Sequence, residues 1–252
     1  MRRIEILYFN KKKGAISLAT VLLIALCFVG AKMGYQEERM VMEDSAVISY
    51  AIANKVIVVD AGHGGVDPGA IRGNIVEKDI TLEISKKLTE KLSQAGALVI
   101  MTRETETDVI GEEISGKISN RKRKDLARRV EKAEEAKADL FISIHTNADV
   151  SSKWRGAQTF YSSGSEISKI YAESIQEEMT RILGNTNRKA KPGSYYVMDK
   201  SSMPTVIVEV GFISNPQEAK LLQDDAYQSQ VCYSILSGIV KAELQKMQVE
   251  EN

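Results

Sequence analysis

Two short apolar runs, each leading to one of the two histidines in the chain, constrain the fold most. Residues 55–59 read Lys-Val-Ile-Val-Val and precede His63, and residues 139–145 read Asp-Leu-Phe-Ile-Ser-Ile-His. Such runs, rich in β-branched side chains, are typical of strands that are buried on both faces. Open α/β sheets bind their ligands at the carboxyl ends of strands. We therefore expect His63 and His145 to lie at equivalent strand ends and to share one site.

The loop after the first of these strands is rich in glycine and cannot continue as a helix. It contains four glycines between residues 62 and 69, together with Pro68, and glycine permits backbone conformations that other residues avoid. A phosphate-binding loop is disfavoured, because the loop has neither the Gly-x-Gly-x-x-Gly spacing nor a terminal Gly-Lys-Ser/Thr, and Pro68 removes a backbone donor. A serine hydrolase is also disfavoured, because the chain lacks a Gly-x-Ser-x-Gly turn.

The rest of the chain alternates between helical and strand patterns, which indicates a layered α/β sheet. Apolar side chains recur every four positions in residues 77–92, as on one face of a helix. Ser165 is the predicted N-cap of a helix over residues 167–182. The other expected elements are strands at 97–101, 156–161, 195–198 and 205–210, an insertion loop at 102–119, a charged surface helix at 120–138 and a terminal helix through 235–244.

Charge is spread unevenly along the chain. The formal net charge of the 252 residues is zero, but five basic residues and one acidic residue leave the first 31 residues at +4, and the remainder therefore at −4. A weakly acidic body lacks the basic face that a nucleic-acid-binding protein needs. The run Arg-Lys-Arg-Lys at residues 121–124 is interpreted as a solvated helix face, with contact to an anionic polymer as the less favoured alternative.

The N-terminal segment has the pattern of an export signal or a membrane anchor. Residues 14–31 carry no charge and follow three consecutive lysines, which is the arrangement expected when the basic flank stays in the cytoplasm. We expect residues 1–13 to form this flank, residues 14–33 to be a transmembrane anchor or a signal peptide, and residues 34–54 to be a linker.

Glu209 is the strongest single indication of chemistry. It interrupts the apolar run Val-Ile-Val-Glu-Val at residues 206–210, and burial of an ionised carboxylate costs several kcal/mol unless a partner offsets it. A metal ion, or a water that the metal activates, would be such a partner. Two imidazoles and one carboxylate around an open fourth position form a known zinc arrangement for amide hydrolysis.

Each candidate ligand also has a simpler interpretation. His63 suits a turn cap, and His145 suits a buried core position. Glu77 suits the first turn of a helix, where the helix dipole favours an acid, and Asp79 and Glu83 are alternative ligands beside it. The pairing of two histidines at matching strand ends with a buried glutamate favours a metal site.

Three motifs, in this order, resemble those of the zinc-dependent N-acetylmuramoyl-L-alanine amidases (amidase type 3) of bacterial cell-wall turnover. They are Val-Val-Asp-Ala-Gly-His-Gly-Gly at residues 58–65 with Asp67, Gly69 and Glu77, Ala-Asp-Leu-Phe-Ile-Ser-Ile-His-Thr-Asn-Ala at 138–148, and Val-Glu-Val-Gly-Phe-Ile-Ser-Asn at 208–215. The likeness extends from residue 55 to about residue 245. Within the family, the chain is most similar to the membrane-anchored, germination-associated amidases that act on the cortex of bacterial spores.

The resemblance implies a fold and a set of residue roles. The expected fold is a single α/β domain, with a mixed central β-sheet flanked by helices on both faces, over residues 55–247, preceded by the N-terminal membrane segment and followed by a tail at 248–252. The zinc ligands of the family fall on His63, Glu77 and His145, with one Zn²⁺ per site, and its catalytic glutamate falls on Glu209. Asn147, two residues after His145, is a candidate substrate contact, with a structural turn as the alternative.

The implied reaction is hydrolysis of the amide bond between N-acetylmuramic acid and L-alanine in peptidoglycan, in spore cortex maturation by muramic lactam formation or in germination. The expected partners are the muropeptide substrate, the membrane and an activating protein, but no nucleic acid. The catalytic domain is expected outside the cytoplasm, on the cortex side of the forespore. The rival functions are a zinc carboxypeptidase acting on the stem peptide and a non-catalytic wall-binding module. Residues 108–124 form a longer segment than the minimal family loop, so the resemblance does not define this wall of the predicted cleft.

Overall fold

A six-stranded sheet forms the centre of the computed structural model, which describes residues 48–111 and 117–250. Its strand order is β4–β1–β5–β8–β6–β7. The strands are β1 (Val56–Ala61), β4 (Leu98–Met101), β5 (Leu140–Asn147), β6 (Gln158–Ser162), β7 (Lys191–Gly193) and β8 (Thr205–Phe212). Strands β4, β1, β5 and β8 are parallel, whereas β6 pairs antiparallel with β8 and parallel with β7. The predicted mixed sheet is therefore confirmed.

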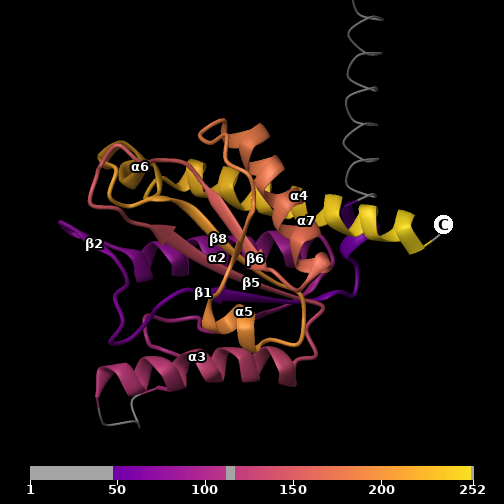
Figure 1. Ribbon diagram of the computed structural model, residues 1–252, viewed down its shortest axis with the longest axis horizontal. Helices are drawn as coiled ribbons and strands as arrows, with labels where there is room; N and C mark the ends of the chain where they lie inside the picture. The colour runs from indigo at the N-terminus through magenta and orange to yellow at the C-terminus, as the bar shows by residue number, and fades with distance from the viewer. Residues whose placement is uncertain (1–47, 112–116, 251–252) are drawn as a thin grey trace, which may run out of the picture. The chain divides into compact units, whose positions relative to one another are not determined.

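Helices cover both faces of the sheet, as predicted (Figure 1). The larger apolar core contains residues from α2 (Glu77–Gln94), α4 (Glu166–Leu183) and α7 (Asp225–Glu250). A smaller core on the opposite face contains residues from α3 (Ile118–Glu135) and α5 (Tyr196–Lys200). The predicted N-cap is also confirmed, because the Ser165 side chain accepts a hydrogen bond from the backbone N–H of Ser168 at the start of α4.

The alternation of side chains along the strands determines which face carries the polar groups. In β1, Ile57 and Val59 belong to the larger core, whereas Val58 belongs to the smaller core beside α3. Asp60 shares the face of Val58 and reaches Arg129 of α3. Polar residues at the carboxyl ends of the strands therefore gather on the face that α3 and α5 cover.

Three short elements complete the described chain. Strands β2 (Ile71–Arg72) and β3 (Ile75–Val76) form an antiparallel hairpin directly before α2, and α6 (Pro216–Leu221) follows β8. Residues 48–52 are helical, and the Ile52 side chain is fully buried in the larger core. The packed unit thus includes residues that precede Lys55.

One local prediction was wrong, and another was incomplete. Residues 195–198 were expected to form a strand, but α5 occupies residues 196–200 and the short strand β7 lies before it. Val197 and Met198 both enter the smaller core; adjacent strand residues would point to opposite faces, so a helical turn buries both side chains. The charged helix α3 is also more than a surface helix, because the Arg129 side chain is 1% exposed.

The N-terminal predictions fall on residues that the structure does not describe. The flank at 1–13 and the membrane segment at 14–33 both lie outside the described residues. The same is true of residues 34–47, the first part of the predicted linker. Between residues 48 and 250, leaving aside 112–116, no helix has the length and apolar character needed to cross a membrane.

Candidate functional site

His63 lies in the loop after β1, in a backbone conformation that side-chain contacts hold in place. Its φ angle is 64°, in the left-handed region that residues other than glycine rarely adopt. The guanidinium of Arg129 donates a hydrogen bond to the His63 carbonyl oxygen. Arg103 donates to the carbonyl oxygens of the two preceding residues, Ala61 and Gly62, at 2.9 and 3.0 Å. Two buried arginines therefore fix the direction in which the His63 side chain points.

Glu77 brings the two histidines together. It is the first residue of α2, and its Oε1 atom lies 3.2 Å from Nε2 of His63 and 3.2 Å from Nδ1 of His145. The two imidazole rings lie edge to face, with their centroids 4.9 Å apart. One ligand atom from each of the three residues lies within 4.8 Å of the other two. The three residues can therefore hold a metal ion.

Backbone donors fix the Glu77 carboxylate. Its Oε2 atom accepts from the N–H of Ala70 at 2.8 Å, and its Oε1 atom accepts from the N–H of Thr146 at 2.9 Å. Burial raises the pKa of Glu77, but the hydrogen bonds and charges of His145 and His63 outweigh burial and hold the pKa well below its usual range. Gly69, at a φ of 68°, leaves no room for a side chain, because a Cβ atom there would lie 2.6 Å from Glu77 Oε2.

Asp67 orients the other side of the His63 ring. Its Oδ2 atom lies 3.0 Å from Nδ1 of His63, which leaves Nε2 facing Glu77. Its Oδ1 atom lies 2.6 Å from the ammonium group of Lys122. Burial lowers the pKa of His63, but the hydrogen bonds and charges of Asp67 and Glu77 outweigh burial and raise the pKa to about 9.

Glu209 lies on β8, in register with His145 on β5. Its Oε2 atom is buried and has no hydrogen-bond partner among the residues that the structure describes. Burial, helped by the negative charge of Glu77, raises the pKa of Glu209 to about 7, against the opposing effect of the two histidines. The carboxyl group therefore titrates near neutral pH, where it can accept and release a proton.

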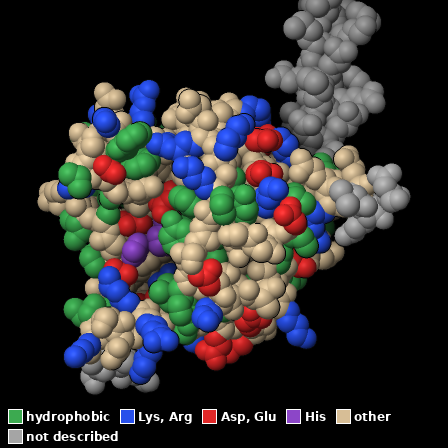
Figure 2. Space-filling view, in the orientation of Figure 1, with side chains coloured by type: hydrophobic (Ala, Val, Ile, Leu, Met, Phe, Trp, Pro, Cys, Tyr) green, Lys and Arg blue, Asp and Glu red, His purple; other side chains and the backbone are tan. Residues whose placement is uncertain are grey.

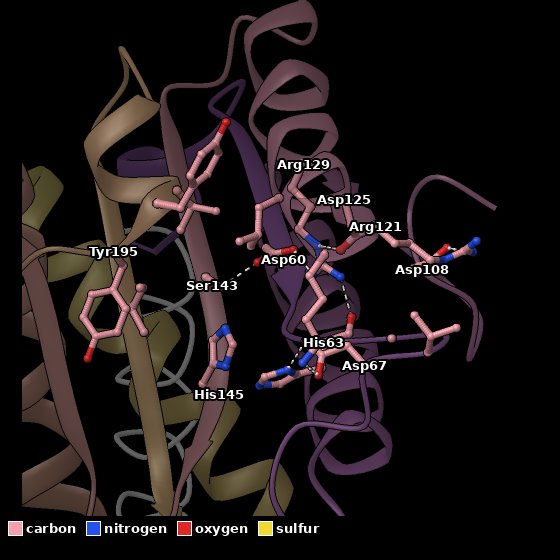
Figure 3. Close-up of a pocket in the computed structure, with 17 residues that line it drawn as sticks. Asp60, His63, Asp67, Asp108, Arg121, Asp125, Arg129, Ser143, His145 and Tyr195 are labelled. Atoms are coloured by element: carbon pink, nitrogen blue, oxygen red, sulfur yellow. Dashed lines mark hydrogen bonds and ion pairs between the residues drawn. The ribbon is translucent and has the colours of Figure 1, made fainter. Parts of the chain in front are cut away.

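A cavity of about 190 Å³ opens beside the histidines, on the face of the sheet that α3 and α5 cover. Both histidines are visible in a hollow on the surface, next to acidic side chains (Figure 2). Figure 3 shows His63 and His145 at one end of this cavity, with Asp60, Arg129 and Asp125 above them. The Arg129 guanidinium donates to Asp60 and to Asp125, both at 2.7 Å.

The structure brings together the four side chains that the sequence singles out, and separates the alternatives from them. Asp79 and Glu83 are exposed on α2 and do not belong to the cluster of His63, Glu77 and His145. Asn147 ends β5, where its carbonyl oxygen accepts from the N–H of Ile213 at 2.8 Å. It is not among the described residues that line the cavity, and its contact with substrate stays a prediction.

Sequence reasoning missed three contributors to the site. Asp60 and Arg129 form a buried ion pair that lines the cavity, and Tyr195 lines it as well. Asp60 gave a usable signal, since it interrupts an apolar strand in the same way as Glu209. Arg129 gave none, because it stands among many charged residues of α3.

The fold and the site together define a class of protein: an α/β domain with a His–Glu–His cluster and a partly buried glutamate at the carboxyl edge of its sheet. The chain belongs to the N-acetylmuramoyl-L-alanine amidase family, whose model matches residues 57–241, and it is an enzyme of that class. It is 45% identical over 194 residues to the germination-specific N-acetylmuramoyl-L-alanine amidase of Bacillus subtilis, covering 77% of this chain and 81% of the relative.

Two solved structures show the same relationship. The chain is similar to the CwlD amidase of Clostridioides difficile, solved in complex with the GerS lipoprotein, with 40% identity and a TM-score of 0.73 over 78% of this chain and 100% of that one. It is also similar to the catalytic domain of the amidase CwlV from Bacillus (Paenibacillus) polymyxa var. colistinus, with 33% identity and a TM-score of 0.63 over 77% and 99% of the two chains.

Proposed function

We propose that this amidase uses one zinc ion, held by His63, Glu77 and His145, with Glu209 as its general base. The observation that carries the proposal is the convergence of three ligand atoms within 4.8 Å of one another. They lie beside a strand on which one Glu209 carboxyl oxygen has no partner within the described part of the chain. A donor set of two imidazoles and one carboxylate, with a position left open, suits catalytic zinc. Oε2 of Glu209 is buried next to these donors without a partner among the described residues, as expected in a site that binds a metal and a substrate.

When bound, zinc supplies Lewis-acid polarisation of the scissile carbonyl and a lowered pKa for water, from 15.7 toward about 7. Glu209 accepts a proton from the attacking water and returns it to the leaving amine of L-alanine. Its pKa of about 7 suits both transfers, because a general acid–base works best when its pKa lies near the working pH. Asp67 holds His63 by its Nδ1 atom, so that Nε2 stays directed at the ion site.

The proposed substrate is peptidoglycan of the spore cortex, cut between the lactyl group of N-acetylmuramic acid and L-alanine. The support is the likeness to a germination-specific amidase of B. subtilis. Residues 14–33 would carry the catalytic domain across a membrane and either anchor it there or be cleaved. An activating protein is a further proposed partner, supported by the complex of the C. difficile relative with a lipoprotein.

Product analysis on purified cortex and on vegetative wall, with and without a chelator, tests this function. We expect peptide-free glycan from cortex, and loss of the reaction when the metal is removed. A stem-peptide carboxypeptidase would instead leave shortened peptides on the glycan, and a wall-binding module would give no product. Mass spectrometry of the digests separates the three outcomes, and either of the last two would refute the proposal.

A further inference from the structure

The cavity beside the histidines has two walls of different chemistry (Figure 3). The wall formed by α3, the His63 loop and Asp108 carries paired charges, including Lys122 with Asp67 at 2.6 Å and Arg121 with Asp108 at 2.7 Å. The opposite wall is aromatic and apolar, and consists of Tyr195, Tyr196, Val197 and Ile207. A substrate that enters the cavity therefore meets charges on one side and an apolar surface on the other.

Tyr195 is the exposed part of the apolar wall, and Phe160 and Gly193 pack against its ring. The residue is 38% exposed. Its ring lies edge to face against Phe160, with the centroids 5.5 Å apart. The absence of a side chain at Gly193 makes room for the ring, because a Cβ atom at that position would lie 2.8 Å from Tyr195 Cε2. A large aromatic ring kept in place and partly exposed in a cavity is a preformed surface for a ligand.

The hydroxyl group of Tyr195 is available to a ligand. It makes no hydrogen bond with any residue in the described part of the chain. Burial, together with the negative charge of Glu209, raises the pKa of Tyr195, so the hydroxyl stays protonated and can donate near neutral pH.

We propose that Tyr195 binds the saccharide half of the muropeptide, with its ring against the muramic acid and its hydroxyl on a polar substituent of the sugar. A sugar ring offers an apolar face of C–H groups, bordered by hydroxyl and amide groups, which matches a phenol ring in an apolar wall. The charged wall offers the sugar no such surface, because its cations already have carboxylate partners, as Lys122 has in Asp67. The two walls thus orient the substrate across the ion site, and the inference rests on the proposed function.

Two substrates that share the scissile bond test the role of Tyr195. One is a disaccharide muropeptide, and the other is the matching lactoyl-peptide, which lacks the sugar ring. We expect Tyr195→Ala in the zinc-loaded full chain to lower kcat/KM about tenfold on the muropeptide, mainly through KM, because one aromatic contact is lost. The variant should cleave the lactoyl-peptide as the unmodified enzyme does.

Tyr195→Phe separates the hydroxyl from the ring and covers the case in which the alanine variant folds poorly. It should lower kcat/KM roughly fivefold on the muropeptide, the value of one hydrogen bond, again without effect on the lactoyl-peptide. Tyr233→Phe is the control, because Tyr233 is exposed on α7, which covers the other face of the sheet. Zinc content and melting temperature are measured for each variant.

Two results would overturn the inference without touching the proposed function. One is an equal loss on both substrates, which would place Tyr195 at the reacting bond or in the framework. The other is unchanged activity of both Tyr195 variants on the muropeptide. If the unmodified enzyme releases no peptide from the muropeptide, the proposed function fails, and the role of Tyr195 fails with it.

Discussion

Asp60 and Glu209 place carboxylates on the same face of one sheet, yet their surroundings are opposite. Asp60 accepts hydrogen bonds from Thr102, Ser143 and Arg129 at 2.5–2.7 Å. Burial raises the pKa of Asp60, but Arg129 and the two hydroxyls outweigh burial and lower it. In Glu209 burial prevails, and the pKa rises to about 7 while Oε2 stays unpartnered among the described residues.

This difference separates Asp60, a carboxylate that stabilises the fold, from Glu209, the carboxylate proposed to act in the reaction. A fully paired buried charge connects elements, here β1, β5 and α3. An unpaired one costs stability, and a protein retains it where reactivity requires it. The two positions should therefore respond to the same amide substitution in opposite ways.

Glu209→Gln should have the largest effect on activity, and it should lower turnover without removing the metal. The amide keeps the shape of the side chain but cannot accept the proton, so we expect kcat to fall by about 10²–10⁴-fold with zinc content unchanged. Peptide release from purified muropeptides and metal analysis measure the two quantities.

His63→Ala is the matched comparison for this variant, because it removes a proposed ligand and should lose metal and activity together. Near-normal turnover by Glu209→Gln would contradict the role of Glu209 as general base.

Asp60→Asn should act on folding instead. Removal of one partner from a buried ion pair costs about 3–5 kcal/mol of unfolding free energy, because the Arg129 guanidinium, 1% exposed, loses a counter-charge. Urea unfolding of the chelated protein measures this loss.

Glu83→Gln provides the control for Asp60→Asn, since Glu83 pairs with Lys86 at the surface and should change stability by less than about 1 kcal/mol. If Asp60→Asn is as stable as that control, the ion pair does not support the framework.

The contrast also explains what the sequence could and could not reveal. Glu209 and Asp60 both interrupt apolar strands, so their burial is predictable from local pattern. Their partners are not, because Thr102, Arg129 and Ser143 lie 42, 69 and 83 residues from Asp60. Sequence shows that a charge is buried, whereas only the fold shows whether anything pairs with it.

The histidine cluster was predictable because parallel strands bring their carboxyl ends to one edge. The role of α5 was not, since Tyr-Tyr-Val-Met suits a strand by local preference. Its helical turn depends on an apolar pocket built by α3 and the sheet, to which Val197 and Met198 both contribute. Tyr195 reaches the cavity as a consequence of that packing.

The carboxyl groups of Glu209 and Asp60 should make the unfolding free energy of the metal-free protein depend on pH in opposite ways. The pKa of Glu209 is raised from 4.5 to about 7, so its contribution to stability is complete below pH 4.5 and declines by up to about 3 kcal/mol as pH rises to 7. The pKa of Asp60 is lowered from 3.8, so its contribution is present above pH 3.8 and is lost as pH falls further.

Urea unfolding of the chelated protein between pH 4.5 and 8.5, with and without Glu209→Gln, isolates the first effect. The variant should gain stability relative to the unmodified chain as pH rises from about 5 to 8. A difference that stays constant across this range would mean that Glu209 is not desolvated in solution.

Asp67 is an intermediate case, a half-buried carboxylate that pairs with a proposed ligand rather than with the framework. It holds Nδ1 of His63 at 3.0 Å and Lys122 at 2.6 Å. Asp67→Asn should weaken zinc binding about 10–100-fold, since a residue that orients a metal-bound histidine typically contributes this much. Competition with a chelating dye measures the affinity, and saturating zinc should restore most of the turnover.

Asp79→Asn makes the same change of charge on the exposed side of α2 and should leave the zinc affinity unaltered. If both variants bind zinc as the unmodified enzyme does, the contact between Asp67 and His63 has no part in holding the metal. If Asp79→Asn alone weakens binding, the ligand on α2 is not Glu77. The pair of variants therefore tests the orientation of His63 and the choice of the acidic ligand in one comparison.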